Sequence, residues 1–304
     1  MIRRALITGA GGFVGGHLAA GLMARGVAVT ALDRAFDAPA RARLAGARLV
    51  TADLRAGLPP LGGQDVILHA AALTTDPAAA GLDPAAHLAV NMQLLEAALE
   101  LAAGLRPRLF VFLSSGGVFA AGDGAPDFTD ERVPTGLTPY ALAKRQGEAL
   151  VPAALPPGTG ALVLRLGNIC GPGEIPRPSR QRVSRLQGWI DAARTGEIAL
   201  ATPAARRDWT WAPDLAPALL RLAAAAAAEG EGGRPLHLTS GHILRDEALA
   251  GEVARQTRAR VICRPDGSAA RPPLVASDLE ALAGFGWTPP AAMVAGLLCA
   301  EVRA

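Results

Sequence analysis

Lysine and tyrosine are almost absent from this sequence of 304 residues. It has one tyrosine, Tyr140, and one lysine, Lys144, so that 29 of its 30 basic residues are arginine. Aromatic residues make up only 4% of the chain, whereas half of all residues are hydrophobic. This composition predicts a tightly packed, helix-rich protein long enough to bury a substantial core.

Cysteine is also scarce. Cys170, Cys263 and Cys299 are odd in number and show no Cys-x-x-Cys spacing, which argues against both a disulfide framework and a zinc site. We therefore expect no bound metal and a reduced, cytoplasmic setting.

Runs of like charge are missing too. The net charge of +3 comes from arginines spread along the chain, which gives little support for a nucleic-acid partner. The uncharged run 5–24 is long enough to cross a bilayer, but six glycines and His17 interrupt it, and no signal-peptide pattern precedes it. We expect neither a targeting segment nor a membrane partner.

The segment 138–148, TPYALAKRQGE, predicts the beginning of a helix. Thr138 suits the N-cap and Pro139 the first helical position, and a spacing of four places Lys144 on the same face as Tyr140. A nearby ammonium lowers the pKa of a phenol from its ordinary value of about 10, which suits proton exchange with a substrate. The alternative is a Tyr and a Lys sharing a solvated face; the rarity of both residues favours catalysis.

Glycines at positions 9, 12 and 15 follow a predicted strand at 4–8 and precede a helix running to about residue 25. Such a turn lets the backbone approach a pyrophosphate at the helix N-terminus, although it can also serve only close helix packing. A second strand, 27–32, ends at Asp33, where a carboxylate can accept both hydroxyls of an adenosine ribose. Asp33 favours NAD, while Arg34 beside it can pair with a 2′-phosphate and keeps NADP open.

Further strands are predicted at 48–52 and 65–69. Asp53 and Leu54 follow the first, in a position suited to the adenine edge. The second ends at His69 and runs into three alanines, whose small side chains let a flat cofactor lie against the backbone. Because the neighbours of His69 are all apolar, we interpret it as a core residue and not as a base or ligand.

A continuous hydrophobic strand at 108–113 is predicted to be central in the sheet. It leads to Ser115, at the carboxyl end where parallel sheets place their chemistry. Asn91 lies in the predicted helix 84–103 and is either a satisfied core amide or part of the cofactor site.

Taken together, these motifs resemble the short-chain dehydrogenase/reductase superfamily, in its extended branch of NAD-dependent epimerases and dehydratases, and are similar to those of nucleotide-sugar 4-epimerases. They cover most of the chain through residue 216. In order they are TGAGGFVG at 8–15, Asp33, ADL at 52–54, HAAA at 69–72, SSGGVF at 114–119, Y-x-x-x-K at 140–144, RLGNICGPG at 165–173 and RRDWTWAPDLA at 206–216.

The resemblance implies an α/β fold: a Rossmann-type, doubly wound parallel sheet with a smaller C-terminal α/β substrate lobe. Residues 1–166 would form the NAD-binding domain, to which 212–240 return. Residues 167–211 and 241–304 would form the substrate lobe.

It also implies the roles of individual residues. Tyr140 would exchange a proton with a substrate hydroxyl or carbonyl, Ser115 would hydrogen-bond the same oxygen, and Lys144 would lower the phenol's pKa and hold the nicotinamide ribose. The implied cofactor residues are Gly9, Gly12, Phe13, Val14, Gly15, Asp33, Arg34, Asp53, Leu54, Ala70, Ala71, Ala72, Asn91, Tyr140 and Lys144. The implied substrate residues are Ser115, Gly116, Asn168, Arg177, Arg207 and Arg264.

Departures from the family's motifs narrow the reaction. Dehydratases of this branch place an Asp-Glu pair directly after the serine or threonine, where this sequence has Gly116 and Gly117. Without that pair, β-elimination of water lacks its general acid and base. Farther on, the arginines between 177 and 185 either clamp a phosphate or carboxylate or form a solvated face.

We therefore expect an NAD-dependent oxidoreductase that acts on a sugar or sugar nucleotide as an epimerase, by transient oxidation of a secondary alcohol. One alternative is a net NAD(P)-dependent dehydrogenase of a small polyol or sugar acid, and another is an NAD-sensing protein without turnover. The apolar helices at 84–103 and 139–155 suggest a homodimer, as in related enzymes.

Overall fold

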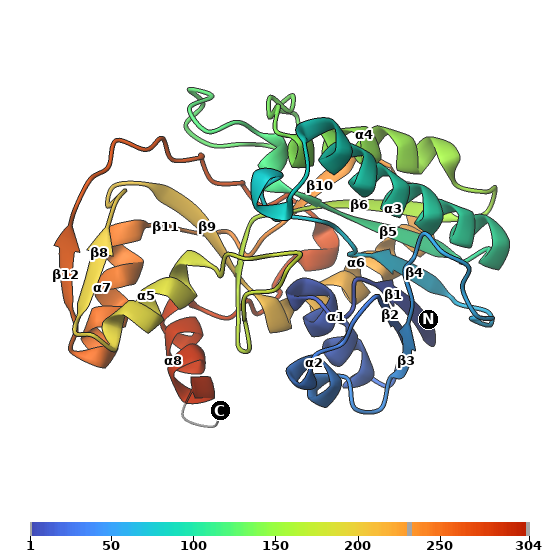
Figure 1. The fold of residues 1–304 in the computed structure, drawn as a ribbon, viewed down its shortest axis with the longest axis horizontal. Helices are drawn as coiled ribbons and strands as arrows, with labels where there is room; N and C mark the ends of the chain where they lie inside the picture. The colour runs from blue at the N-terminus through green and yellow to red at the C-terminus, as the bar shows by residue number, and fades with distance from the viewer. Residues whose placement is uncertain (1, 230–232, 302–304) are drawn as a thin grey trace.

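The computed structural model describes residues 2–229 and 233–301. A seven-stranded sheet forms the centre of the larger lobe, on the right in Figure 1, and its strand order is β10-β6-β5-β4-β1-β2-β3. All of its pairings are parallel. The strands are β1 (Arg4–Thr8), β2 (Ala28–Asp33), β3 (Arg48–Thr51), β4 (Val66–His69), β5 (Leu109–Ser115), β6 (Gly160–Leu166) and β10 (Pro235–Leu238).

Helices cover both faces of this sheet. One face carries α1 (Phe13–Met23), α2 (Ala38–Arg43) and α6 (Leu215–Glu229). The other carries α3 (Pro84–Leu105) and α4 (Pro139–Ala154), which pack on each other. The strand order reverses direction between β1 and β4, and in doubly wound sheets the ligand crevice lies at this point. The predicted Rossmann-type fold is confirmed.

The smaller lobe consists of two short sheets and three helices, and it has a core of its own. One sheet has the order β11-β9-β7 and the other pairs β12 with β8. The strands are β7 (Asn168–Cys170), β8 (Glu197–Leu200), β9 (Arg206–Trp211), β11 (His242–Arg245) and β12 (Arg260–Cys263), and the helices are α5 (Arg185–Ala193), α7 (Asp246–Thr257) and α8 (Pro290–Glu301).

One part of the C-terminal region does not follow the predicted boundary. Leu279, Phe285 and Trp287 pack against the core of the larger lobe, although the whole of 241–304 was expected in the smaller one. Trp287 and Phe285 also contact each other edge to face, with ring centroids 4.6 Å apart. Aromatic side chains bury large apolar areas, so this segment holds the two lobes together.

By length and composition, α3 is the one described helix that could cross a membrane. In this fold Leu95, Ala98 and Ala102 bury one side of it in the core of the larger lobe. Packing on the sheet therefore accounts for part of its apolar character, with 28% of the apolar window buried.

Candidate active site

Two pockets follow the carboxyl edge of the large sheet and join above the glycine-rich turn. The first has a volume of about 140 Å³ and the second of about 320 Å³. Both are lined by Gly9, Gly12, Ala70, Ala72 and Ser179. They therefore form one elongated groove across the switch point of the sheet.

The glycine-rich turn gives this groove a floor that suits a pyrophosphate. Gly9 has φ +71°, and a Cβ there would lie 2.5 Å from the Ala71 backbone nitrogen, while a Cβ on Gly15 would lie 2.3 Å from the Gly9 carbonyl oxygen. Gly12 begins α1 without a side-chain cap, whereas Asp37, Asp83, Thr138 and Ser184 cap α2, α3, α4 and α5. The first turn of α1, with Phe13, Val14 and Gly15, faces the second pocket, and free N–H groups at a helix N-terminus bind anions.

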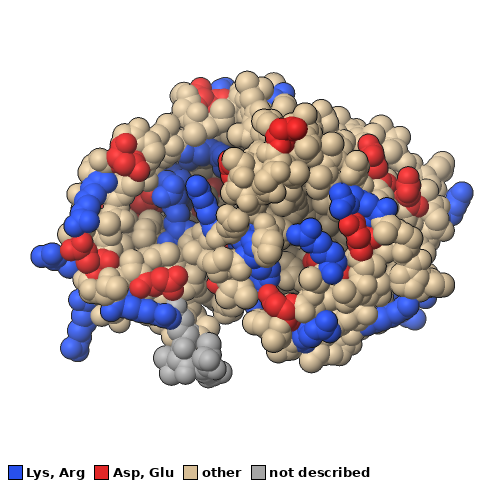
Figure 2. Space-filling model, in the orientation of Figure 1, with Lys and Arg blue, Asp and Glu red and all other residues tan. Residues whose placement is uncertain are grey.

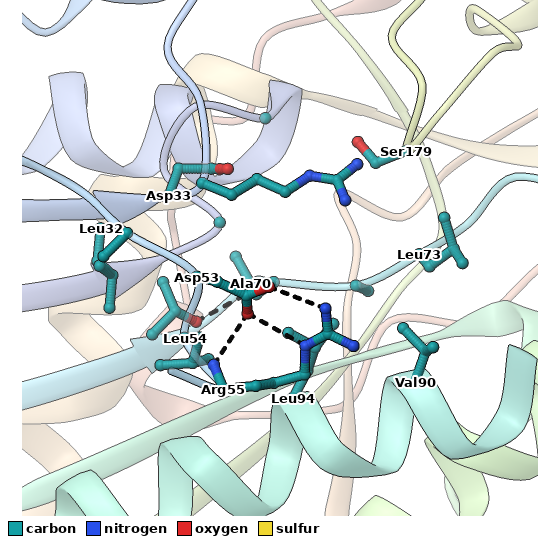
Figure 3. Close-up of a pocket in the computed structure, with 17 residues that line it drawn as sticks. Leu32, Asp33, Asp53, Leu54, Arg55, Ala70, Leu73, Val90, Leu94 and Ser179 are labelled. Carbon is teal, nitrogen blue, oxygen red and sulfur yellow. Dashed lines mark hydrogen bonds and ion pairs between the residues drawn. The ribbon is translucent and has the colours of Figure 1, made fainter. Parts of the chain in front are cut away.

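Asp33 stands at the end of β2 in the first pocket, beside Arg34. Its carboxylate accepts hydrogen bonds from the Gly11 nitrogen at 3.0 Å and, more weakly, from the Ala35 nitrogen at 3.4 Å. Burial raises the pKa of Asp33, and these hydrogen bonds oppose that rise. Figure 3 shows Asp33 and Ser179 along one side of the pocket and Leu54, Val90 and Leu94 along the other.

Asp53 lies in the same pocket, but Arg55 already engages its carboxylate. Arg55 donates from its backbone nitrogen at 2.9 Å, from Nε at 3.1 Å and from Nη2 at 2.8 Å. These hydrogen bonds lower the pKa of Asp53 to about 2. Asp53 therefore stays ionised at neutral pH, and Leu54 supplies the apolar wall next to it.

Asn91 shapes the wall of the groove without lining it. Its Oδ1 accepts from the Leu73 nitrogen at 2.9 Å, and its Nδ2 donates to the Leu73 oxygen at 3.1 Å and the His87 oxygen at 3.2 Å. Of the two interpretations of Asn91, the structure favours the satisfied core amide, because these bonds use both ends of the amide. Asn91 instead fixes the segment that follows Ala70, Ala71 and Ala72, which line the first pocket.

His69 is a core residue, as interpreted from the sequence. Its Nδ1 is 2.9 Å from the Thr8 hydroxyl, and its ring stacks on that of Phe112 at 6.1 Å. Burial, with a smaller effect of the Lys144 charge, lowers the pKa of His69 to about 3. The imidazole is therefore neutral and sits beneath the site.

Ser115, Tyr140 and Lys144 all line the second pocket. Thr138 caps α4 through a 3.2 Å hydrogen bond from the Ala141 nitrogen, so the helix begins where the sequence predicts. Lys144 is 6% exposed and donates from Nζ to the Leu113 oxygen at 2.8 Å. Its burial lowers the pKa of Lys144 to about 8, and the charge of Glu148 opposes that change.

The Ser115 hydroxyl lies close enough to the phenol of Tyr140 to affect the pKa of that phenol. Ser115 Oγ also accepts from the Gly117 nitrogen at 3.0 Å, which leaves its proton free to point toward the phenol. Burial raises the pKa of Tyr140, and the Ser115 hydrogen bond and the charges of Arg180 and Arg271 act in the opposite direction.

The predicted effect of Lys144 on this phenol is not what the structure shows. Its ammonium lies 5.7 Å from the centroid of the Tyr140 ring and is directed to the carbonyl of Leu113. The positive charges that lower the pKa of Tyr140 belong to two arginines instead. The expectation was wrong because helix spacing gives the shared face but not the direction of a long, flexible side chain.

A third, smaller pocket of about 60 Å³ opens off the second one at Ser115, Leu166 and Gly167. Arg207 and Arg271 both line it. Figure 2 shows basic side chains gathered in the hollow where the two lobes meet. This end of the groove is thus suited to an anionic part of a substrate.

The two arginines keep part of their hydrogen-bonding capacity for a ligand. Arg207 donates from Nε to Asp246 at 2.8 Å and from Nη2 to the Thr202 hydroxyl at 3.1 Å. Arg271 donates from Nε to the Phe119 oxygen at 3.0 Å. Among the described residues no further partner of Arg271 is present, so both of its terminal nitrogens remain available to a ligand.

Arg264, which the sequence suggested for this role, lies elsewhere. Its side chain is 68% exposed just after strand β12 and pairs with Glu197 at 3.1 Å, and it lines none of the three pockets. That prediction was wrong. Arg271 was missed because it lies in a segment without regular secondary structure, where periodicity gives no indication of direction.

Asn168 and Gly116 line the third pocket as predicted for substrate residues. Asn168 donates to the buried carboxylate of Asp208 from its backbone nitrogen at 3.1 Å and from Nδ2 at 3.4 Å. Asp208 also accepts from the Leu274 nitrogen at 3.1 Å. A Cβ on Gly167 would lie 1.5 Å from Asp208 Oδ2, so this wall requires glycine at 167.

Residues 172–180, which we name the strap, cross the groove and are tied to the larger lobe on both sides. Arg177 donates from Nε to Asp37 at 2.9 Å. On the other side, the backbone nitrogens of Thr74 and Thr75 donate to the Ser179 oxygen at 2.9 and 3.1 Å. Arg177 therefore serves first as a tether, which neither of the two interpretations of the arginines 177–185 foresaw.

Arg180 is the strap residue nearest the chemistry. It lines the second pocket, forms an ion pair with Glu174, and lies with its guanidinium carbon 5.3 Å from the Phe13 ring. Its charge lowers the pKa of Tyr140. The sequence placed it in an arginine-rich run but gave no sign that it faces the tyrosine.

Acidic side chains are missing from the second pocket. Among the described residues that line it, none is Asp, Glu, His or Cys. A Cβ on Gly117 would lie 3.2 Å from Ser115 Oγ and 3.4 Å from the Tyr140 ring, and one on Gly116 would lie 3.3 Å from the Leu274 side chain. Apart from the arginines, Tyr140 and Lys144 are thus the ionisable side chains among the described residues that line this pocket.

Comparisons with known proteins agree with this geometry. The model of the NAD dependent epimerase/dehydratase family matches residues 5–235. A 4-hydroxy-2-methyl-3-oxo-4-farnesyl-3,4-dihydroquinoline-1-oxide ketoreductase of Stigmatella aurantiaca is 33% identical over 201 residues, covering 63% of this chain and 58% of that protein, less than two thirds of its length. The GDP-6-deoxy-D-mannose reductase of Pseudomonas aeruginosa is 29% identical over 255 residues, covering 79% and 76%.

Among solved structures, a UDP-glucose-4-epimerase from Stenotrophomonas maltophila with bound NAD and formylated UDP-arabinopyranose has the same fold. Its TM-score is 0.80 at 21% identity, with 99% of this chain and 98% of that chain covered. The likeness therefore extends over both lobes.

Proposed function

The chain belongs to the NAD dependent epimerase/dehydratase family, and on this basis we propose that it oxidises and reduces a secondary alcohol or ketone of a sugar carried by a nucleoside diphosphate. One observation carries the proposal. Tyr140, Ser115 and Lys144 share a pocket that joins the pocket of Asp33 on one side and the pocket of Arg207 and Arg271 on the other.

The residues of the groove fit the family's cofactor. The uncapped first turn of α1 suits the pyrophosphate, and Asp33 suits the adenosine ribose, whose hydroxyls can donate to it. A 2′-phosphate would meet the negative charge of Asp33, which favours NAD over NADP. NAD, when bound, supplies the hydride acceptor for oxidation and, once reduced, the donor for reduction.

The side chains of the site provide the proton transfer. During oxidation of an alcohol the Tyr140 oxygen takes the hydroxyl proton, and during reduction it returns a proton to the carbonyl oxygen. Ser115 donates to the same substrate oxygen from its position beside the phenol. The charges of Arg180 and Arg271 favour the phenolate, and Arg207 and Arg271 hold the anionic end of the substrate.

Dehydration is not part of this proposal. Elimination of water requires an acid and a base beside the reacting carbons in addition to the tyrosine. Gly116 and Gly117 occupy the positions where such a pair would stand, and a side chain at either would crowd Leu274 or Tyr140.

We propose epimerisation as the first course of the reaction, because the strap favours a cofactor that stays bound. Arg177, Thr74 and Thr75 tie the strap over the groove, so release of a nucleotide requires several interactions to break. An enzyme that oxidises and re-reduces one sugar regenerates its cofactor at every turnover and needs no exchange.

Net reduction or oxidation is the second candidate. It is favoured by the names of the curated relatives, one of which is a ketoreductase and two of which are sugar-nucleotide reductases. This course requires the strap to open once per turnover. A small polyol or sugar acid, with a carboxylate held by the arginines, is the corresponding substrate for a dehydrogenase.

Two measurements on the purified protein separate these candidates. First, the nucleotide that denaturation releases is identified and its amount per chain is measured. Second, the protein is incubated with a panel of UDP-, GDP- and dTDP-linked sugars, their 4-keto forms, aldonic acids and polyols. An epimerase retains about one NAD per chain and forms the epimer without a lasting change in reduced nicotinamide absorbance. Steady consumption or accumulation of NADH selects the net oxidoreductase, and no turnover of any compound contradicts the proposal.

We further propose a cytoplasmic homodimer whose two-fold interface pairs α3 and α4 with their copies. Only 28% of the apolar window of α3 is buried within the chain. Light scattering at micromolar concentration tests the dimer, and a monomeric mass would refute it.

A further inference from the structure

A buried ion pair lies directly behind the only lysine of the protein. Glu148 is one helical turn after Lys144 on α4 and is 7% exposed. Its carboxylate accepts from Arg165 Nε at 2.8 Å and from Arg165 Nη2 at 2.7 Å. A third donor, the Ser114 hydroxyl, lies 2.6 Å from Oε1. The carboxylate is thus held by three hydrogen bonds in a place without access to water.

Lys144 and Glu148 are hydrogen-bonded to consecutive residues of strand β5. Lys144 donates to the carbonyl of Leu113, and Glu148 accepts from the side chain of Ser114. Arg165 comes from β6, where it is the register partner of Ser114. The end of β5 therefore fixes both charges relative to each other, and residues four apart on a helix are neighbours on one face.

We propose that Glu148 is a positioning residue that keeps Lys144 in its charged form where it lines the second pocket. A buried ammonium tends to lose its proton, because burial disfavours the charged form. A fixed carboxylate nearby opposes this tendency. The ion pair of Glu148 and Arg165 takes no part in the proton transfer itself, and this proposal gives it a functional role.

No other acidic group among the described neighbours of Lys144 can take this role. On its own helix the remaining ionisable neighbours are Tyr140 and Arg145, which donates to the Gly136 oxygen, and on β4 the neighbour is His69, whose ring is neutral. Across the pocket stand Arg177 and Arg180, both cationic.

The helix and turn packed against α4 add no competing charge near the ammonium. At Gly147, α3 presents the side chain of Leu95, and its glutamates, Glu96 and Glu100, are exposed. Its His87 is bonded to the Thr75 carbonyl at 2.9 Å. The turn η2 (Gly116–Val118) carries no charge.

The effect of Glu148 on Lys144 is visible in the pKa of the lysine. Burial lowers the pKa of Lys144 to about 8, and the charge of Glu148 is the one influence that raises it. At neutral pH the ammonium is therefore still mostly protonated. Without the carboxylate a larger fraction of the amine would be neutral, with the unpaired guanidinium of Arg165 behind it.

This inference rests on the proposed function, under which the ammonium donates to the nicotinamide ribose. Loss of its proton removes a donor and a charge at once. Glu148 then determines the highest pH at which the site works.

The composition of the chain makes the test direct. Because Lys144 is the only lysine, protein labelled with [ε-13C]lysine gives one lysine resonance, whose titration reports the pKa of this ammonium. In the wild type we expect a midpoint at about 8. In Glu148→Gln we expect a midpoint lower by at least about one unit, the effect of losing a close opposite charge. The pH at which NAD affinity begins to fall should decrease with it.

Two further variants separate charge from structure. Ser114→Ala removes one hydrogen bond to Glu148 but no charge, so the lysine midpoint should stay within a few tenths of a unit of the wild type. If Glu148→Gln does not fold, the double variant Glu148→Gln/Arg165→Met removes both members of the buried pair, a replacement that proteins often tolerate. Its midpoint should also lie below that of the wild type.

A lysine midpoint unchanged from the wild type, in whichever of these two charge variants folds, would overturn the inference. The titration is measured on the protein without substrate, so this result would leave the proposed function standing. Conversely, failure to find a substrate would not affect the titration.

Discussion

Replacing Arg271 tests whether the small pocket beside the tyrosine holds an anion. Arg271 lines that pocket, and only its Nε donates to a protein atom, the Phe119 oxygen at 3.0 Å. A ligand phosphate can therefore be bound by both terminal nitrogens. A hydrogen bond to a charged group contributes about 1.5–3 kcal/mol, so Arg271→Gln should reduce kcat/KM by roughly 10- to 150-fold.

The reduction should have two parts. Loss of the phosphate contact raises KM for a nucleotide-linked substrate. Loss of the positive charge raises the pKa of Tyr140, since that charge is one of those that lower it, and this shifts the pH profile of kcat upward. Steady-state kinetics between pH 6 and 10 separate the two effects, and thermal unfolding confirms that the variant is folded.

Arg264→Gln is the matched control. It removes the same chemical group from an exposed pair with Glu197, and exposed pairs contribute little. We expect kinetics within about twofold of the wild type. If Arg264→Gln were the damaging change and Arg271→Gln the silent one, the assignment of the pocket would be refuted.

Three further predictions concern the walls and the chemistry of the site. Gly167→Ala places a Cβ 1.5 Å from Asp208 Oδ2 and should break the two backbone hydrogen bonds that this carboxylate accepts. We expect the free energy of unfolding, measured in urea, to fall by about 3–5 kcal/mol. A loss under about 1 kcal/mol would contradict this. Asp37→Asn keeps a residue suited to the N-cap of α2 but removes the ion pair with Arg177 that ties the strap to the larger lobe. NAD should therefore dissociate several times faster in stopped-flow measurements. An unchanged dissociation rate would show that this ion pair does not tether the strap. In protein labelled with [ζ-13C]tyrosine, the single phenol should titrate above its ordinary pKa, because burial raises the pKa of Tyr140. Addition of NAD⁺ should lower the titration midpoint. A midpoint below 10 without NAD⁺ would contradict the effect of burial.

The sequence predicted those parts of the site that local structure determines. Thr138 and Pro139 define where α4 begins, and Lys144 then follows Tyr140 on the same face. The glycine-rich turn and Asp33 likewise sit at fixed offsets from β1 and β2. In each case the geometry depends on a strand end or a helix cap a few residues away, which a single sequence contains.

The parts that could not be predicted depend on contacts between distant segments. Arg271 reaches the pocket because the segment that carries it is held across the cleft, with a backbone bridge from Leu274 to Phe128. Asn91 turns to Leu73 and not to the groove. Arg177 finds Asp37, 140 residues earlier. None of these residues belongs to a pattern whose spacing indicates its partner.

The most direct test of the account is the substitution Tyr140→Phe, which removes one oxygen and keeps the ring. NAD should bind with nearly unchanged affinity, while the rate of reduced nicotinamide formation or decay in a single turnover should decrease by about 10²- to 10⁴-fold, the usual contribution of a general acid–base. A variant that binds NAD and retains the wild-type single-turnover rate would contradict the claim that this phenol exchanges the proton.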